Sequence, residues 1–194
     1  MQLNHLDINN FLRSRRSTFV ADYTGEKIAD NIITTILENA SYAPTHKRTE
    51  PWHFKVFSEG GLHTLFAKIA SIYQETTPIE LFSQEKYNKF AENAKKVSHV
   101  VAICMKRDAA ERVPEIEEIC AVACAVQNIY LSITAYKLGG YWSTGGGVFS
   151  PEMHQFLELG EKDRCLGLFY MGVTTKEQEQ AKRSPIATKI SWIK

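Results

Sequence analysis

The sequence of 194 residues predicts an α+β fold, in which helices flank a mixed sheet. Stretches with the helical spacing of apolar residues outnumber the short strand-like runs, and the two kinds are interleaved along the chain. No repeat, low-complexity tract or Pro/Gly/Ser-rich linker interrupts them. We therefore expect residues 1–194 to form a single domain, since a chain of this length can bury a core of its own.

The first half of the chain is expected to begin with a short helix at residues 7–16, which ends at two arginines. Apolar residues recur every fourth position between Thr24 and Tyr42 and predict a helix there, which Pro44 ends. Residues 52–57 alternate in the way typical of a strand. The remaining expected elements are helices at 60–75 and 83–97, a buried strand at 98–105, a short helix at 150–159, a strand at 164–173 and an extended tail at 174–194.

The strongest expected element is a helix from Pro114 to Leu138. Apolar residues cover both of its sides, and a helix of this kind is buried all round. Gln127 and Asn128 interrupt the run before the roughly 20 apolar residues that a membrane span needs. In so small a chain a partner subunit buries such a helix most easily, so we expect a homodimer and no membrane insertion.

The charge balance argues against a general attraction to polyanions. Lys plus Arg number 23 and Asp plus Glu number 22, which gives a net charge of +1 and no field that would recruit nucleic acid or an anionic membrane. The N-terminus lacks the basic start and apolar run of a signal peptide, so we expect a cytoplasmic protein.

The four cysteines lie in apolar runs, as reduced core thiols of a cytoplasmic protein do. Cys120 and Cys124 have a spacing that two metal ligands on a helix could share, but no further ligand lies nearby in the sequence. We expect both to pack in the core. A Cys/His hydrolase has no supporting motif.

Arg15, Arg16 and Ser17 form the first candidate binding motif. Two neighbouring guanidinium groups and a hydroxyl can hold a phosphate through charge-assisted and bidentate hydrogen bonds. A basic pair at a solvated helix end is also commonplace, because cations favour helix C-termini. The loop 43–52 (Ala-Pro-Thr-His-Lys-Arg-Thr-Glu-Pro-Trp) adds three cationic or cation-capable side chains that can face the same anionic ligand.

Residues 139–147 (Gly-Gly-Tyr-Trp-Ser-Thr-Gly-Gly-Gly) form the second candidate motif. They can be a flexible loop that ends the preceding helix, with Gly139 as its cap. Their spacing fits neither a P-loop nor the glycine fingerprint of a Rossmann unit. Glycines also let backbone amides approach a planar ring closely, which is the functional alternative.

Arg15-Arg16-Ser17 and the loop 43–52 together resemble the nitroreductase family of FMN flavoproteins, and within it a small bacterial subgroup with an Ala-Pro-Asp-His-Lys loop. The resemblance extends from Arg15 to Trp192. It implies a nitroreductase-like α+β fold and an intertwined homodimer with FMN at the interface. It also implies ping-pong chemistry, in which NADH or NADPH reduces the flavin and a nitroaromatic, a quinone or a related acceptor reoxidises it. No side chain need then act as a catalytic acid or base, because the flavin carries the chemistry.

The resemblance assigns four residues to the phosphate end of the cofactor. In relatives the Arg-Arg-Ser triplet grips the FMN phosphate and ribityl chain, which implies cofactor binding by Arg15, Arg16 and Ser17. Basic residues of the C-terminal segment also approach the phosphate in relatives, and Arg183 matches them.

The resemblance places five further residues near the flavin ring. Trp142, Ser143 and Thr144 match positions that pack against the isoalloxazine and hydrogen-bond its edge. His46 and Tyr42 match positions that reach the flavin of the other subunit. A cation near N1 and O2 of the reduced flavin stabilises its negative charge and raises its reduction potential.

Three positions depart from the subgroup pattern. Arg is frequent where Tyr42 and Ser143 stand, and Gln is usual where Glu50 stands. Two other functions stay open, namely a flavin-binding protein without turnover and a dehydrogenase or enone reductase for one specific metabolite. Rapid bleaching of the bound flavin by NADPH without oxygen favours an enzyme, whereas slow bleaching favours the binding protein.

Overall fold

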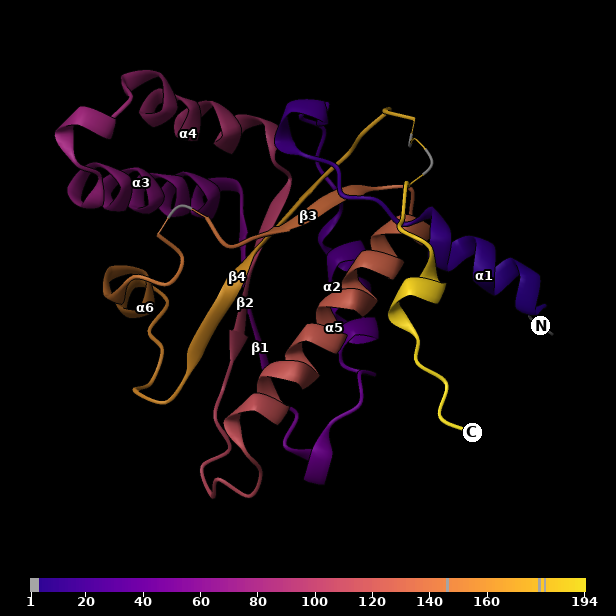
Figure 1. Cartoon of the computed structure of the whole chain (residues 1–194). Coiled ribbons are helices and arrows are strands. Elements are labelled where there is room, and N and C mark those ends of the chain that lie inside the picture. The colour runs from indigo at the N-terminus through magenta and orange to yellow at the C-terminus, as the bar shows by residue number, and fades with distance from the viewer. Residues whose placement is uncertain (1–3, 146, 178, 180) are drawn as a thin grey trace.

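A four-stranded sheet lies between two layers of helices (Figure 1). The structure is a computed structural model that describes residues 4–145, 147–177, 179 and 181–194. The strands are β1 (Trp52–Ser58), β2 (His99–Met105), β3 (Gly139–Ser143) and β4 (Arg164–Gly172), in the spatial order β1-β2-β4-β3. The helices are α1 (His5–Ser14), α2 (Asp30–Ala40), α3 (Glu59–Thr76), α4 (Gln84–Lys96), α5 (Glu115–Ala135) and α6 (Pro151–Phe156), with short 3₁₀ turns at Val20–Asp22, His46–Arg48, Ile79–Leu81 and Ile186–Lys189. The α+β class is confirmed.

Each pair of neighbouring strands in the described chain is antiparallel, which differs from the expected mixed sheet. β2 and β3, which α5 connects, run in the same direction, but β4 lies between them and opposes both. α3 and α4 form a helical hairpin. It leaves the end of β1 and returns to the same end of the sheet, where Ser58 pairs with His99, so β2 runs antiparallel to β1.

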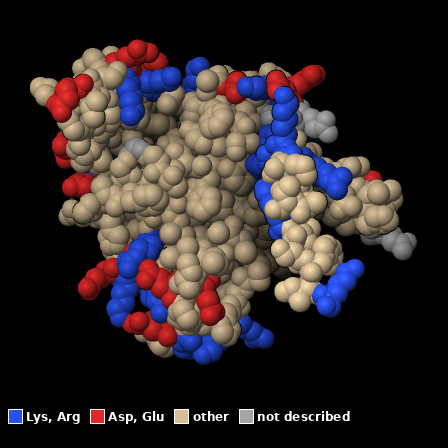
Figure 2. Space-filling model, in the orientation of Figure 1, with Lys and Arg blue, Asp and Glu red and all other residues tan. Residues whose placement is uncertain are grey.

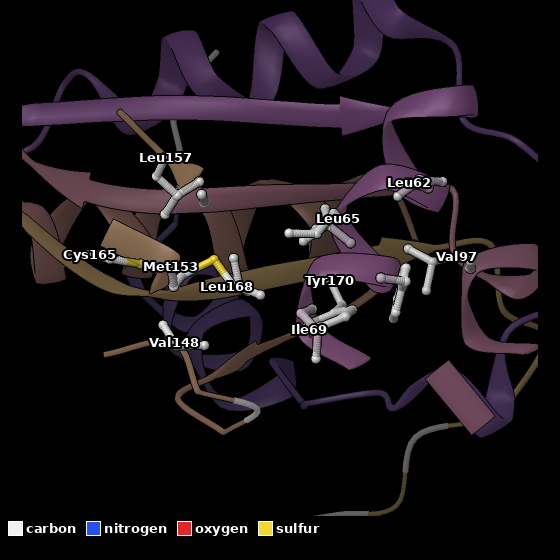
Figure 3. Close-up of a cluster of buried hydrophobic side chains, with 14 of the residues drawn as sticks. Leu62, Leu65, Ile69, Val97, Val148, Met153, Leu157, Cys165, Leu168 and Tyr170 are labelled. Carbon is white, nitrogen blue, oxygen red and sulfur yellow. The ribbon is translucent and has the colours of Figure 1, made fainter. Parts of the chain in front are cut away.

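Alternate residues of the central strands pack on opposite faces, so both faces of the sheet are buried. From β2, Val101 and Ile103 lie in a cluster with α2 and α5. Val100 and Ala102 lie in a second cluster with α3, α4 and α6, part of which Figure 3 shows. This burial on both sides explains why β2 and β4 are continuous apolar runs in the sequence and do not alternate.

α2 begins at Asp30 and not at Thr24, which corrects the expected start of this helix. The preceding segment is tied to the start of β2 instead. Nζ of Lys27 donates to the carbonyl of Val97 at 2.7 Å, and the N–H of the next residue donates to Oγ of Ser98 at 2.7 Å. These tertiary hydrogen bonds satisfy backbone and side-chain groups that a longer helix would have used locally.

The glycine-rich stretch begins as a strand and not as the loop considered above. Gly139–Ser143 forms β3 beside β4. A side chain at Gly140 would place its Cβ 2.6 Å from Cδ1 of Ile133 and 2.8 Å from Cε1 of Phe169. Glycine is therefore required by the close packing of β3 on α5. Gly146, quoted in the motif, lies outside the described residues.

α5 is buried on one side only within the chain. Val122, Val126 and Ile129 are buried against the sheet and α2. The exposed or half-buried residues of the other side, called the open face below, are Ile116, Ile119, Cys120, Ala123, Cys124, Gln127 and Leu131. The expectation that Cys120 and Cys124 pack in the core is wrong for the single chain, because both are exposed. By length and composition alone α5 could also cross a membrane, a test that core helices of soluble proteins pass as well.

Both ends of the chain lie on the same side of the molecule (Figure 1). α1 has no buried residue, and the described part of the segment 181–194 is exposed along almost all of its length. The two segments carry large apolar side chains that soluble chains seldom expose together, namely Leu6, Phe11, Leu12, Ile186, Ile190, Trp192 and Ile193.

Candidate functional site

A basic cavity lies where the C-terminal end of α1 meets the C-terminal segment. Its volume is about 390 Å³, and its lining residues are Leu12, Arg13, Arg15, Arg16, Ala181 and Arg183. Figure 2 shows lysine and arginine side chains gathered along this side of the molecule, whereas the middle of the face in view is almost free of charged groups. The structure thus brings three of the residues expected at the phosphate, Arg15, Arg16 and Arg183, into one place.

Arg16 uses most of its donors within the chain. Its Nε donates to the carbonyl of Glu179 at 2.6 Å, and its Nη1 donates to the carbonyls of Arg13 and Arg15 at 2.7 and 2.8 Å. The guanidinium therefore joins the end of α1 to the C-terminal segment. Nη2 makes no hydrogen bond to the described residues and could still face a ligand.

Arg15 lies against an aromatic ring of α5. Its Cζ is 4.8 Å from the centroid of the Tyr130 ring, and within the described ranges its guanidinium makes no hydrogen bond. Oγ of Ser17 lies 3.4 Å from the hydroxyl of Tyr130. The same hydroxyl accepts a hydrogen bond from the backbone N–H of Trp142 at 2.8 Å. Tyr130 thus joins the Arg-Arg-Ser motif to β3.

Tyr130 was missed by the sequence interpretation, which treated it as part of an apolar helix face. One signal was present, because Tyr130 is the single aromatic residue of α5 and a tyrosine hydroxyl usually finds a polar partner when it is buried. The partners come from segments distant in the sequence, which spacing alone does not identify.

The three residues expected at the flavin ring lie at the end of β3 in different environments. The indole of Trp142 packs on Gly167, where an added Cβ would come within 2.1 Å of Nε1. That nitrogen is buried and has no hydrogen-bond partner in the described chain. Oγ of Ser143 accepts from the N–H of Gly145 at 3.3 Å, and Thr144 is exposed. Ser143 and Thr144 are therefore accessible to a ligand, whereas Trp142 packs in the cluster around α5.

The second candidate region is a groove of about 460 Å³ at the N-terminal end of α5. Its lining residues are Pro44, Thr45, His46, Ile116, Glu117, Cys120, Ala121 and Cys124. Nδ1 of His46 and Oε2 of Glu117 lie 2.6 Å apart, so a carboxylate that the sequence interpretation did not single out holds the imidazole. Tyr42, expected to act beside His46, does not line the groove and is 86% exposed.

Three residues of the loop 43–52 adopt a left-handed backbone: Lys47 (φ 50°), Arg48 (φ 53°) and Glu50 (φ 45°). For residues other than glycine this conformation costs on the order of 1 kcal/mol each. One hydrogen bond to a distant segment and one within the loop hold this backbone in place. Nζ of Lys47 donates to the carbonyl of Arg112 at 2.8 Å, and the N–H of Glu50 donates to Oγ1 of Thr45 at 3.1 Å. Strain that is held in this way is typical of binding sites.

The start of α5, which carries Glu117, is fixed by a buried ion pair. Arg107 pairs with the buried Glu118, whose Oε1 also accepts from the N–H of Asp108 at 3.1 Å. Hydrogen bonds from Arg112 lower the pKa of the Asp108 carboxyl to about 2. The carboxylate that holds His46 therefore lies on a well-anchored part of the chain.

Comparison with known proteins identifies related sequences. The model of the nitroreductase family matches residues 12–173. The Bacillus subtilis (strain 168) protein named "Putative NAD(P)H nitroreductase YfhC" is 28% identical over 183 residues, which are 94% of this chain and 92% of that protein.

Solved structures share the fold. The nitroreductase-like family protein from Bacillus cereus has a TM-score of 0.80 at 23% identity, with 100% of this chain and 99% of that chain covered. The FMN-dependent nitroreductase NfnB from Mycobacterium smegmatis, in complex with NADPH, has a TM-score of 0.75 at 14% identity, with 98% and 99% covered. A Desulfovibrio desulfuricans protein in complex with FMN has a TM-score of 0.71 at 18% identity, with 100% and 99% covered. Because the family model covers most of the sequence, this chain belongs to the nitroreductase family.

Proposed function

We propose that the protein is an FMN-dependent NAD(P)H oxidoreductase that works in the cytoplasm as a homodimer and reduces nitroaromatic, quinone or related acceptors. The observation that carries the proposal is the basic cavity at α1, which Tyr130 connects to the end of β3. A site for the FMN phosphate at the basic cavity would then lie next to a site for the flavin ring at the end of β3. Bound FMN would supply the hydride transfer, and the residues of this chain would bind, orient and shield it.

The basic cavity suits the phosphate of a mononucleotide. Arg15 and Arg183 line it from two segments of the chain, and a guanidinium matches a phosphate through paired hydrogen bonds. Ser17 follows directly and offers a hydroxyl to the ribityl chain or the phosphate. One phosphate-binding motif, without a dinucleotide fingerprint in the sequence, favours FMN over FAD.

The distance along α5 supports a site that two subunits share. Glu117 and Tyr130 are separated by about 20 Å of helix. The ribityl chain between phosphate and ring is too short to bridge that separation. His46, which Glu117 holds, and Arg15, which lies against Tyr130, are thus at different ends of α5, and the family resemblance implies that the position of His46 acts on the flavin of the other subunit. In a homodimer formed through the open face, His46 would act on the flavin of the partner.

The test of the proposed function is an absorbance spectrum followed by anaerobic titration with NADH and with NADPH. We expect the protein to purify with FMN and to bleach rapidly. A colourless protein that also fails to bind added FMN would refute the proposal. Slow bleaching would favour a flavin-binding protein without turnover. Rapid bleaching without reduction of nitroaromatics or quinones would favour an enzyme for one specific metabolite.

We expect the protein to be a dimer that does not dissociate without unfolding. The open face and the apolar ends of the chain together expose more apolar surface than soluble monomers tolerate. Light scattering at low micromolar concentration should give about twice the chain mass of 22.0 kDa. Ala123→Glu, at the middle of the open face, should lower the dimer fraction, whereas Lys89→Glu on the exposed side of α4 should not. A wild-type mass near 22.0 kDa would contradict the dimer.

His46→Ala should lower the reduction potential of the bound flavin. A protonated imidazole carries a positive charge, which would stabilise the negative charge of a reduced flavin beside it. Glu117 engages Nδ1, so Nε2 is the nitrogen that remains for the flavin of the partner. A drop of about 30 mV would correspond to about 1.4 kcal/mol of lost stabilisation.

Spectroelectrochemical titration of wild type and variants measures this effect. Glu117→Gln keeps a hydrogen-bond partner for His46 but removes the charge, so it should give part of the shift. An unchanged potential in His46→Ala would mean that His46 only packs against its neighbours.

A further inference from the structure

Tyr130 is the residue at which the Arg-Arg-Ser motif, α5 and β3 meet. We infer that Tyr130 is a positioning residue that orients Arg15 and Ser17 toward the phosphate of the cofactor. The inference rests on the proposed function, because it concerns the same site.

The ring of Tyr130 orients Arg15. A guanidinium that lies over an aromatic face, here at 4.8 Å from the centroid, is attracted to the ring. The guanidinium makes no hydrogen bond to the described residues, so its N–H groups stay available for a ligand. Those N–H groups form the planar fork that binds phosphate in a bidentate way. The contact with Tyr130 therefore holds Arg15 in place while its donors stay available to an anion.

The hydroxyl of Tyr130 orients Ser17. It accepts the N–H of Trp142 at 2.8 Å, which leaves its own hydrogen to be donated elsewhere. Oγ of Ser17 lies 3.4 Å from the Tyr130 hydroxyl and can accept this hydrogen. When Ser17 accepts this hydrogen, its own hydrogen is directed away from Tyr130 and is available to an oxygen atom of the cofactor.

Tyr130 itself is held by the core. Its ring meets the fully buried Phe169 edge-on, with centroids 4.7 Å apart and an interplanar angle of 71°. α1, in contrast, has no buried residue, and the guanidinium of Arg15 at its end makes no hydrogen bond to the described residues. Tyr130 thus transmits the rigidity of the sheet and α5 to Arg15, which the end of α1 carries.

The experiment compares FMN with riboflavin, which lacks the phosphate but keeps the ring and the ribityl chain. The apoprotein of the full chain is titrated with each flavin, and binding is measured by quenching of flavin fluorescence. Tyr130→Leu should weaken FMN binding about tenfold and riboflavin binding by less than about twofold, because the lost contact acts through Arg15. The matched control Tyr136→Leu, at the exposed end of α5, should change neither affinity.

A double-variant cycle gives a second readout. In an Arg15→Ala background, Tyr130→Leu should cause a further loss of FMN affinity of only about threefold, the part that acts through Ser17, because the other residue that it positions is already absent. Fully additive losses would overturn the inference. An equal loss of FMN and riboflavin, which a general packing defect would give, or an unchanged FMN affinity would overturn it as well.

Tyr130→Phe keeps the ring and its packing, and so serves if the leucine variant does not fold. It should weaken FMN binding about threefold through Ser17 and should have no further effect in a Ser17→Ala background. Unchanged FMN affinity in Tyr130→Phe would overturn the role of the hydroxyl. Failure of the wild-type protein to bind either flavin would instead refute the proposed function itself.

Discussion

Arg15→Ala is expected to weaken FMN binding by about ten- to hundredfold, since a lost charge-assisted hydrogen bond costs roughly 1.5–3 kcal/mol. Arg15 makes no hydrogen bond to the described residues, so its donors are available to the phosphate. Arg16 differs, because its guanidinium donates three hydrogen bonds to backbone carbonyls. Arg16→Ala should therefore loosen the C-terminal segment in addition to any effect on the cofactor.

Titration of the apoprotein with FMN measures this loss, and riboflavin is the control ligand because it lacks the phosphate that we expect Arg15 to bind. Ser17→Ala should act in the same direction with a smaller effect. Lys89→Ala, on the exposed side of α4, should leave both affinities unchanged. Wild-type FMN affinity in Arg15→Ala would show that the phosphate binds elsewhere, and Arg183 would then be the next residue to replace.

Gly140→Ala is expected to destabilise the fold by about 1–3 kcal/mol. The added methyl would lie 2.6 Å from Ile133, 2.8 Å from Phe169 and 3.0 Å from the backbone carbonyl of Tyr170. The carbonyl belongs to β4 and cannot rotate away as a side chain can. β3 would have to move away from α5, and the hydrogen bond from β3 to the hydroxyl of Tyr130 would be disturbed with it.

Denaturant unfolding measures the change in stability. Gly60→Ala is the matched control, because nothing lies within 4 Å of a Cβ at that position of α3. Alanine there should keep the stability or raise it by up to about 1 kcal/mol. Gly140→Ala should also weaken flavin binding, whereas Gly60→Ala should not. A Gly140→Ala protein as stable as wild type would contradict the close contact between β3 and α5.

The elements with strong local signals could be predicted from the sequence. The helix expected at residues 7–16 lies at His5–Ser14, and Ser150 does cap α6 by accepting the N–H of Met153 at 3.2 Å. The apolar runs of β2 and β4 were also sufficient to place both strands. In each case neighbouring residues supply the capping bond or the apolar pattern, so the signal is local.

Other features depend on contacts between distant segments and could not be predicted in this way. β4 lies between β2 and β3, and the sequences of these two strands contain no pattern that indicates it. The start of α2 depends on hydrogen bonds to residues beside β2. The sequence around Glu117 and Tyr130 indicates only a helix. Their partners, His46 and Ser17, are far away in the sequence, so the contacts could not be predicted from spacing. The family resemblance supplied His46 and Ser17 but neither of these supporting residues.

The length of α5 also decides which defects can complement each other. If Arg15 and His46 of one chain serve different flavins, a mixed dimer of one Arg15→Ala subunit and one His46→Ala subunit has one site that lacks both side chains and one site that keeps both. Co-expression of two impaired proteins would then restore an intact site in each mixed dimer. A subunit that carries both substitutions, paired with a wild-type subunit, would instead impair both sites.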